Sequence, residues 1–504
     1  MGKACSKVWN CCKQECPHAG VQPSNEDYGD NVVDSSSSSA ALLDASHGPQ
    51  DVSDGLSNVR RVAPCDTSTI SQSREQLDNE DYLRFPILLD KKTIEYAEKS
   101  KVMIILKGLP GSGKSHIARR IQKVFSDCVV CSADSYFMND GVYKFDRDRL
   151  KDAHRSCQEK ACDAAQRGSH VIVIDNTNVK TWESKYYLDL TKKYNYTPLI
   201  LEAQTPWAMD PKELAQKNSH GVPEEVLVQK VKDYEPVLPL YYWWFLNEAD
   251  CRKVSLIARE WLEKALQVPS FFQDFSETTK LLTLKDMLGY YSRNAKKGTY
   301  NVLHTTASVT RRGKTQNGMD YIQSAAVRNS LGKCFDLHII GYVVTPRTFG
   351  ARVKLGSSEL ELWGMDDNEI ETENAMENSS DNIDITCNSA EEIETSCHDT
   401  VTVIPSNLKS DKFCPTSGKG SRAHVTLGCA SNIHPRTTGF DLINVVSCEQ
   451  RVKEIKKSDG TEISDQKVET YAISEGTLRT YGDGIWVIYP EKEVIVSSLF
   501  SAFY

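Results

Sequence analysis

Residues 102–115 read VMIILKGLPGSGKS, and this segment indicates the fold of the first half of the chain. Its apolar start, residues 102–106, predicts a buried strand, and the residues from 114 to about 125 have a helical pattern. Between them lies G-x-x-x-x-G-K-S, a loop whose backbone N–H groups turn inward onto phosphates at the positive end of the following helix. Strand, loop and helix in this order predict a P-loop that binds a nucleotide.

The residues of this loop have separate expected roles. Gly108, Gly111 and Gly113 let the backbone approach the phosphates, because they carry no Cβ. Lys114 is expected to reach the β- and γ-phosphates, and Ser115 to hold Mg²⁺. The predicted ligand is therefore ATP or GTP with Mg²⁺.

Two carboxylates follow other short apolar runs. Asp175 ends the run 171–174 and is the expected Walker B partner of the metal, and Asp134 follows the run 128–131. Such runs, alternating with helical stretches, predict a parallel α/β sheet. Phosphoryl transfer also needs stabilisation of charge, often by Arg. Residues 168–251 contain no Arg, so we expect nucleotide binding without kinase turnover.

A second motif occurs twice in β-like surroundings, as His304-Thr305-Thr306 and His424-Val425-Thr426. Residues i and i+2 of a strand share a face, so each copy offers an imidazole and a hydroxyl to one site. Cyclic phosphodiester hydrolysis needs this set: one His takes a proton from water, the other protonates the departing ribose oxygen, and Thr306 and Thr426 bind the remaining phosphate oxygens. A third copy at residues 398–400 lies in an acidic stretch and is attributed to chance.

From residue 300 the pattern becomes β-rich. Strands are expected at 300–309, 335–344, 351–362, 422–428, 484–489 and 493–499, and helices at 319–329 and 438–456. This predicts an α+β catalytic domain at 294–504 behind an α/β domain at 81–293, whose last part is a helical bridge at about 252–266 followed by a mixed region to 293. Residues of about 365–420 are expected to form a disordered acidic insertion, since such a composition cannot bury enough apolar surface.

Charge and hydropathy exclude several classes of protein. The net charge of the 504 residues is −9, but twelve acidic residues and no Lys or Arg lie between 366 and 400, so the rest is close to neutral and compatible with a phosphate-bearing substrate. No apolar run approaches the roughly 18 residues that span a bilayer, and the start lacks a secretory h-region. Sixteen Cys without such a signal indicate reduced cytosolic thiols.

The first residues carry a lipidation pattern. Met1-Gly2-Lys3-Ala4-Cys5-Ser6 fits M-G-x-x-x-[ST], which predicts myristate on Gly2, and palmitate on Cys5 would supply the second anchor that stable attachment requires. One alternative is an unstructured N-terminal tail without a lipid. The other is a zinc site of residues 11, 12, 16 and 18, although adjacent cysteines fit tetrahedral zinc poorly. Residues 1–80 are therefore expected to be an anchor and disordered spacer, with the protein on the cytoplasmic face of membranes, in particular the plasma membrane.

Residues 303–306, 344–353 and 420–429, together with the P-loop, resemble the vertebrate 2′,3′-cyclic-nucleotide 3′-phosphodiesterase family, and most closely a fish-type, regeneration-associated branch of it. The resemblance covers about residues 82–504 without the acidic insertion. It implies a P-loop polynucleotide-kinase-like domain, in which Asp134 acts toward a 5′-hydroxyl, and a 2H phosphoesterase domain that needs no cofactor or metal. It also implies that Arg422 binds substrate, and that membrane and cytoskeleton (tubulin or actin) are partners.

The implied reaction is hydrolysis of 2′,3′-cyclic phosphates, in nucleotides or at RNA 3′ ends, to 2′-phosphates. Two departures matter: the chain ends Ser501-Ala502-Phe503-Tyr504 without a prenylation Cys, and Val309 occupies the place of an aromatic residue that stacks on the base in mammalian members. Two alternatives stay open. One is a membrane–cytoskeleton adaptor with dormant sites, and the other is a bifunctional RNA end-healing enzyme.

Overall fold

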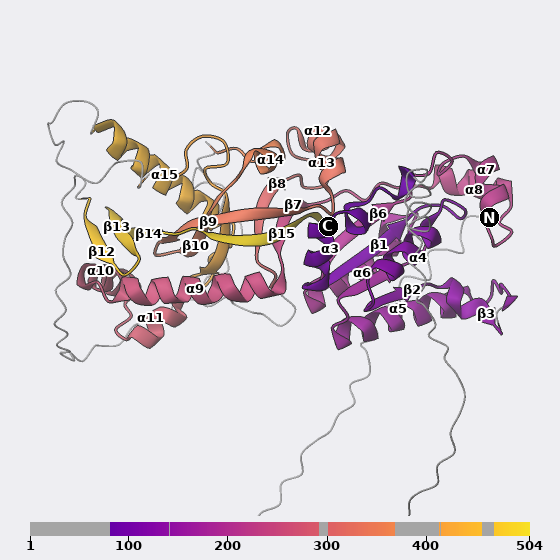
Figure 1. The fold of residues 1–504 in the computed structure, drawn as a ribbon, viewed down its shortest axis with the longest axis horizontal. Helices are drawn as coiled ribbons and strands as arrows, with labels where there is room; N and C mark the ends of the chain where they lie inside the picture. The colour runs from indigo at the N-terminus through magenta and orange to yellow at the C-terminus, as the bar shows by residue number, and fades with distance from the viewer. Residues whose placement is uncertain (1–80, 141, 292–300, 368–412, 414, 456–467) are drawn as a thin grey trace, which may run out of the picture. The chain divides into compact units, whose positions relative to one another are not determined.

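The computed structural model describes residues 81–140, 142–291, 301–367, 413, 415–455 and 468–504, all of which lie in one compact unit, Ser68–Tyr504. Figure 1 shows two sheets, the first in the indigo and purple part of the ribbon and the second mainly in the orange and yellow part. No helix within these residues is both long enough and apolar enough to cross a bilayer.

The first sheet has four parallel strands in the order β2-β5-β1-β6. Its elements are η2 (Asp81–Leu83), α2 (Pro86–Leu89), α3 (Lys91–Glu98), β1 (Val102–Lys107), α4 (Lys114–Val124), β2 (Cys128–Cys131), η3 (Asp134–Phe137), the hairpin β3 (Met138–Asn139) and β4 (Val142–Tyr143), α5 (Leu150–Arg167), β5 (Val171–Ile174), α6 (Thr181–Tyr194), β6 (Thr197–Glu202), α7 (Pro211–Lys217) and α8 (Glu224–Lys232).

Burial explains why these residues form parallel strands. All six residues of β1 and all four of β5 are buried, as expected for strands covered on both faces. The P-loop connects β1 to α4 at the carboxyl edge of the sheet, which is where ligands bind in open α/β sheets. The predicted α/β class is confirmed for this part of the chain.

The second sheet has nine strands in the order β10-β11-β8-β7-β15-β9-β14-β13-β12. Its elements are β7 (Tyr241–Leu246), α9 (Glu248–Leu266), α10 (Pro269–Thr279), α11 (Leu284–Tyr290), β8 (His304–Val309), α12 (Gly318–Gln323), α13 (Ala325–Ser330), β9 (Cys334–Val344), β10 (Thr348–Lys354), α14 (Ser357–Glu361), β11 (His424–Cys429), α15 (Thr437–Ile455), β12 (Thr470–Ile473), β13 (Gly476–Gly482), β14 (Ile485–Pro490) and β15 (Val494–Phe503).

The long strand β9 closes this sheet on itself. Its first half pairs with β15, and its second half pairs with both β10 and β14. The ring β10-β11-β8-β7-β15-β9 therefore has no open edge, and β14, β13 and β12 extend from it as an antiparallel branch. The predicted α+β class of this part is confirmed.

The predicted boundary between the domains needs correction at β7. We assigned residues 240–293 to the first domain, but β7 pairs with β8 and β15 in the second sheet. The helix α9, which we described as a bridge, packs its apolar face, including Val254, Ala258 and Trp261, into the core of that same sheet. An apolar run such as residues 241–246 fits a buried strand of either sheet, so its sequence could not decide between them.

Three smaller differences concern elements and the insertion. The expected strand at 351–362 ends at Lys354 and is followed by α14, and β12 and β13 were not predicted. The predicted bounds of the disordered insertion, about 365–420, include residues that are ordered. Asp367 accepts the backbone N–H of Gly420 at 2.9 Å, and Phe413 is buried beside α15. The predicted disorder of residues 1–80 and of the remaining insertion lies outside the described residues.

Candidate active site and nucleotide site

The two His-x-Thr segments lie side by side. They form the neighbouring antiparallel strands β8 and β11, in which Thr305 is paired with Val425. Both of these central residues are buried, whereas the residues before and after them are only partly covered. Because side chains alternate along a strand, the two imidazoles and two hydroxyls share the opposite face. Each His also lies across from the Thr of the other strand, which gives the site approximate two-fold symmetry.

The two imidazoles are oriented in the same way. The Nδ1 of His304 lies 2.9 Å from the carbonyl oxygen of Val302, and the Nδ1 of His424 lies 2.8 Å from that of Arg422. A carbonyl oxygen only accepts, so Nδ1 carries the proton in both rings. Nε2 is therefore the nitrogen that gains or loses a proton, as an acid–base pair requires.

The surroundings of the two rings differ. His304 is stacked on Trp243, with ring centroids 3.7 Å apart and planes inclined by 14°. His424 packs under the start of α15, where a Cβ at Gly439 would lie 3.1 Å from His424 Cε1. Burial lowers the pKa of His424 to about 4, with a further lowering contribution from the charge of Arg422. His424 is accordingly neutral near pH 7.

The start of α15 also contacts the second threonine. Thr426 Oγ1 donates to Thr438 Oγ1 at 3.1 Å, with the carbonyl oxygen of Pro435 at 3.3 Å. Gly350 on β10 leaves room for this turn, because a Cβ there would lie 2.5 Å from Thr438 Cγ2. The first turn of α15 therefore covers β11 beside the His-x-Thr pair.

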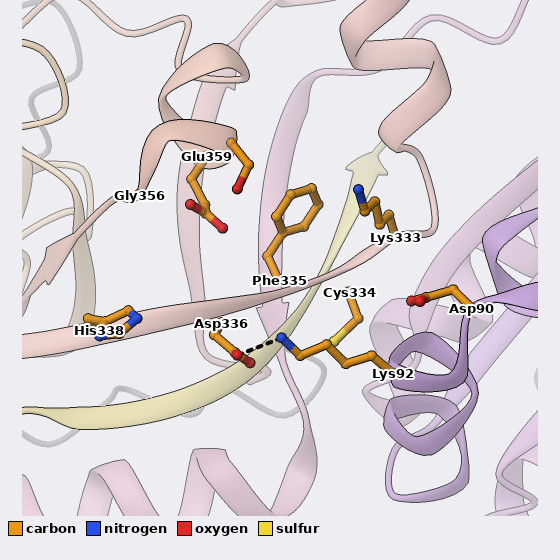
Figure 2. A pocket seen from close by; sticks show the side chains of 10 residues that line it. Asp90, Lys92, Lys333, Cys334, Phe335, Asp336, His338, Gly356 and Glu359 are labelled. Atoms are coloured by element: carbon orange, nitrogen blue, oxygen red, sulfur yellow. Dashed lines mark hydrogen bonds and ion pairs between the residues drawn. The ribbon is translucent and has the colours of Figure 1, made fainter.

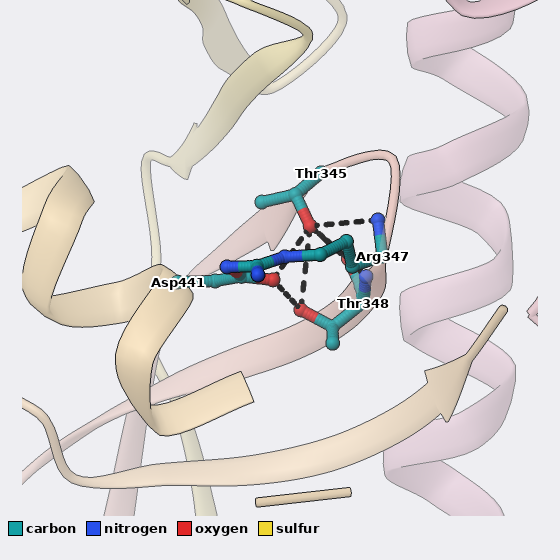
Figure 3. A network of polar contacts seen from close by, with 4 residues as sticks. All are labelled: Thr345, Arg347, Thr348 and Asp441. Carbon is teal, nitrogen blue, oxygen red and sulfur yellow. Dashed lines mark hydrogen bonds and ion pairs between the residues drawn. The ribbon is translucent and has the colours of Figure 1, made fainter. Parts of the chain in front are cut away.

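A buried carboxylate fixes this turn to the sheet. Asp441, on α15, accepts hydrogen bonds from Thr345 Oγ1 at 2.7 Å and Thr348 Oγ1 at 2.6 Å. It also accepts from Arg347 Nε at 3.1 Å and from a second guanidinium nitrogen of the same residue. Figure 3 shows the three donor residues, at the turn from β9 into β10, converging on the one carboxylate. Sequence reasoning missed this network, although residues 344–353 were among the stretches that carry the family resemblance.

Arg422 was predicted to bind substrate, and it lies in the turn two residues before His424, ahead of the start of β11. Its side chain is buried, and its backbone N–H donates to Asp367 Oδ1 at 3.3 Å. What the structure shows directly is a backbone role, since its carbonyl oxygen orients His424. A substrate contact stays a prediction.

The P-loop has the shape that a phosphate cradle needs. Gly108, Gly111 and Gly113 have φ angles of 155°, 82° and 97°, in the region that favours glycine. A Cβ at Gly108 would lie 2.6 Å from Ser112 Oγ, and one at Gly111 would lie 2.7 Å from the carbonyl oxygen of Leu214. Ser112 Oγ is itself buried without a hydrogen-bond partner among the described residues, as expected of a loop whose polar atoms bind a phosphate.

The charged residues of this loop also fit a nucleotide phosphate. Lys114 is buried, and its Nζ donates to the carbonyl oxygen of Leu109 at 2.8 Å. Burial lowers its pKa to about 8, against the opposing charges of Asp175 and Asp134. Burial raises the pKa of Asp175, and Lys114 and the Ser115 hydroxyl oppose that rise. The predicted Walker A and Walker B residues are therefore brought together.

Asp134 is placed at the rim of the same site, in η3. Tyr143 OH donates to its Oδ1 at 3.3 Å, and His220 Nε2 lies 3.3 Å from its Oδ2. His220 belongs to the segment between α7 and α8, which lies in the Arg-free stretch. The role of Asp134 as a base stays a prediction.

A separate cavity of about 340 Å³ has none of the predicted site residues in its lining. Asp90 and Lys92 line it on one side, and residues of β9 and the α14 turn line it on the other (Figure 2). Lys92 Nζ lies 2.5 Å from Asp336 Oδ2, so these two charges neutralise one another. No group of three metal-ligating residues occurs in the described parts of the chain. Gly2, Cys5 and the third His-x-Thr copy lie outside those parts.

Comparisons with known proteins also divide the chain into a part that contains the P-loop and a part that contains the two His-x-Thr segments. A family model described as 2′,3′-cyclic nucleotide 3′-phosphodiesterase (CNP or CNPase) matches residues 238–404 and 395–504, and one described as an AAA domain matches residues 103–237. The chain is similar to 2′,3′-cyclic-nucleotide 3′-phosphodiesterase of Rattus norvegicus, 28% identical over 427 residues, which is 84% of this chain and 87% of the relative. The Mus musculus enzyme of the same name is 28% identical over 424 residues, with the same coverage.

A further relative matches only the P-loop part. NEDD4-binding protein 2 of Homo sapiens is 42% identical over 134 residues, which is 27% of this chain and 8% of that protein. The family boundary between residues 237 and 238 falls just before β7, where the second sheet begins.

Proposed function

Because the chain belongs to the 2′,3′-cyclic nucleotide 3′-phosphodiesterase family, we propose that it hydrolyses the 2′,3′-cyclic phosphates of nucleotides or RNA 3′ ends to 2′-phosphates by a two-His mechanism. The observation that carries the proposal is the antiparallel pairing of the two His-x-Thr strands, centred on Thr305 and Val425. Side chains that lie diagonally across such a pair are roughly 7–8 Å apart. That separation leaves room for a phosphate between the two imidazoles.

The reaction needs one proton taken and one given. In the proposed step a water oxygen attacks phosphorus as one imidazole Nε2 accepts the proton of that water. The P–O3′ bond breaks as the other imidazole donates its proton to the departing oxygen. His424 suits the accepting role, because burial lowers its pKa to about 4 and so keeps Nε2 unprotonated at neutral pH. In this proposal the hydroxyls of Thr306 and Thr426 bind the phosphate oxygens as charge develops, and the hydroxyl of Thr426 would turn from Thr438 to do so.

The direct test is incubation of the full chain with 2′,3′-cyclic AMP and identification of the product by ³¹P NMR. We expect 2′-AMP, formed in the presence of EDTA. Formation of 3′-AMP would place the proton donor at the wrong oxygen, and absence of hydrolysis would favour the adaptor alternative. The full chain is required, since a fragment starting at residue 300 would lack β7 and the helices α9–α11.

For the P-loop part we propose binding of ATP or GTP with Mg²⁺. When bound, Mg²⁺ would neutralise phosphate charge; Ser115 and Asp175 are the residues that would hold it, and Lys114 would turn from the Leu109 carbonyl to the phosphates. The absence of Arg from residues 168–251 supports binding without efficient phosphoryl transfer. Binding of a fluorescent ATP analogue, with and without Mg²⁺, tests this proposal.

We further propose that Gly2 and Cys5 are acylated and hold the protein at the cytoplasmic face of a membrane. The support is the residue pattern alone. Association with tubulin or actin stays an expectation from the resemblance. Metabolic labelling with alkyne-tagged myristate and palmitate tests the acylation.

A further inference from the structure

Trp243 lies on the catalytic face of the sheet. In β7 the side chains of Tyr242 and Trp244 enter the core, so Trp243 points to the other face. It is paired with Thr306 on one side and with Ser501 of β15 on the other, and 9% of it is exposed. The apolar run of β7 gives no sign of this in the sequence, because both of its faces carry aromatic residues.

Trp243 and His304 form a stacked pair. Their planes are inclined by only 14° at a centroid distance of 3.7 Å, which is face-to-face contact. Phe503 lies near-parallel to the indole as well, at 4.3 Å and 23°, and holds it in this orientation. With Nδ1 directed to the carbonyl oxygen of Val302, the stack leaves the His304 ring little freedom to tilt or rotate.

The stack has an electrostatic consequence as well as a steric one. The face of an indole carries the negative part of its quadrupole, so it attracts a cation held over it. A protonated imidazole in this position is therefore stabilised relative to a neutral one. His424 has a different neighbourhood, since it packs against Gly439 of α15 and is close to the positive charge of Arg422. The two catalytic rings are thus biased toward opposite protonation states.

We propose that Trp243 is a positioning residue that holds His304 as the imidazolium whose Nε2 donates its proton to the departing O3′. The inference rests on the proposed two-His hydrolysis. In that step the bond from phosphorus to the water oxygen forms and the P–O3′ bond breaks. One proton passes from water to His424 and one from His304 to O3′, so the pair ends with its charges exchanged. Trp243 itself neither bonds nor exchanges a proton.

The first experiment needs no turnover. In histidine-labelled full-length protein, the ring current of the indole should move the Hε1 resonance of His304 upfield, with the assignment made from His304→Gln. Trp243→Leu should lose this upfield shift, and Trp243→Phe should keep part of it. Trp244→Phe, which changes the adjacent core residue on the opposite face, should leave it in place. An Hε1 resonance that does not respond to Trp243→Leu would overturn the stack.

The second experiment separates positioning from packing. If the imidazolium is stabilised by about 0.5–1 kcal/mol or more, as a cation over an aromatic face is, Trp243→Leu should move the alkaline limb of the kcat profile down by about half a pH unit. We expect kcat to fall about tenfold with KM within about twofold, because the proton transfer belongs to the transition state. Trp243→Phe should restore most of the loss. A reduced kcat with an unmoved alkaline limb would show a purely structural residue and refute the proposal.

The two experiments distinguish failure of the proposed hydrolysis from failure of the proposed role of Trp243. If the wild type hydrolyses no cyclic phosphate, the proposed function fails, but the NMR experiment still decides whether the stack exists. If Trp243→Leu does not fold, the wild type and Trp243→Phe are compared by fluorescence during a pH titration. Protonated imidazole quenches a stacked indole, so the difference between them should titrate, and should cease to do so after His304→Gln. A flat difference would contradict the proposal.

Discussion

Replacing His424 with Gln should change how the stability of the fold depends on pH. Burial lowers the pKa of this ring from 6.5 to about 4 in the folded protein, so on acidification the unfolded chain takes up a proton first. Stability is therefore complete above about pH 7 and is lost as the pH falls toward 4. At pH 5 the linkage relation gives about 2 kcal/mol, and we expect roughly 1–2 kcal/mol because the ring is partly exposed.

The assay is urea unfolding of the wild type and of His424→Gln at pH 7.5 and pH 5.0, followed by fluorescence. All other titrating groups are common to both proteins, so the difference between their pH dependences isolates the one imidazole. The wild type should lose about 1–2 kcal/mol more than the variant on acidification. Thr426→Val is the matched control, since it alters the same strand and the same contact with α15 but should keep the wild-type pH dependence. Equal losses in wild type and His424→Gln would refute the buried, neutral imidazole.

Four further predictions concern the rest of the chain. His304→Ala or His424→Ala should each lower kcat by about 10²–10⁴, with no inhibition of the wild type by EDTA, and near-normal activity in either variant would exclude the two-His mechanism. Lys114→Ala should abolish binding of ATP or GTP while cyclic AMP hydrolysis stays within about twofold in a coupled-product assay; a collapse of hydrolysis would show that the two sites depend on each other. Asp441→Asn should lower the free energy of unfolding by about 2–4 kcal/mol in urea titrations, since a buried carboxylate with four donors is replaced by a neutral amide, and unchanged stability would contradict the network. Gly2→Ala should move the protein from the membrane to the soluble fraction of cells, and continued sedimentation with membranes would show that another anchor acts.

The residues that come together in both candidate sites were easier to predict from the sequence than the residues around them. The P-loop is contiguous, so its glycines, Lys114 and Ser115 could be assigned from spacing alone, and the position of Asp175 followed from the strand before it. Each His-x-Thr copy is also contiguous, so it could be recognised as part of a strand from its apolar neighbours. That β8 and β11 are neighbours depends on the closure of the sheet through β9, which joins residues more than one hundred positions apart. No local pattern contains that information.

The features that were missed depend on contacts that no local pattern in the sequence indicates. Strand faces can be assigned when apolar and polar residues alternate, but β7 is apolar on both faces, one against the core and one beside the two His-x-Thr segments. For that reason its place in the second sheet and the stack of Trp243 on His304 were both invisible in the sequence. Asp441 was missed for a related reason, since a carboxylate on a helix is usually solvated, and only the fold brings Thr345, Arg347 and Thr348 to it.

The asymmetry around the two imidazoles follows from the order of strands in the closed sheet. The strands β8 and β11 are equivalent as a pair, but β8 is followed in the sheet by β7, whereas β11 is followed by β10 and covered by the first turn of α15. The first neighbour supplies an aromatic face and the second supplies a tight, desolvated enclosure. A cation is stabilised by the former and penalised by the latter. Under the proposed two-His mechanism, two copies of one His-x-Thr pattern would therefore receive different proton affinities from the sheet that holds them, which is what a reaction that takes one proton and gives another requires.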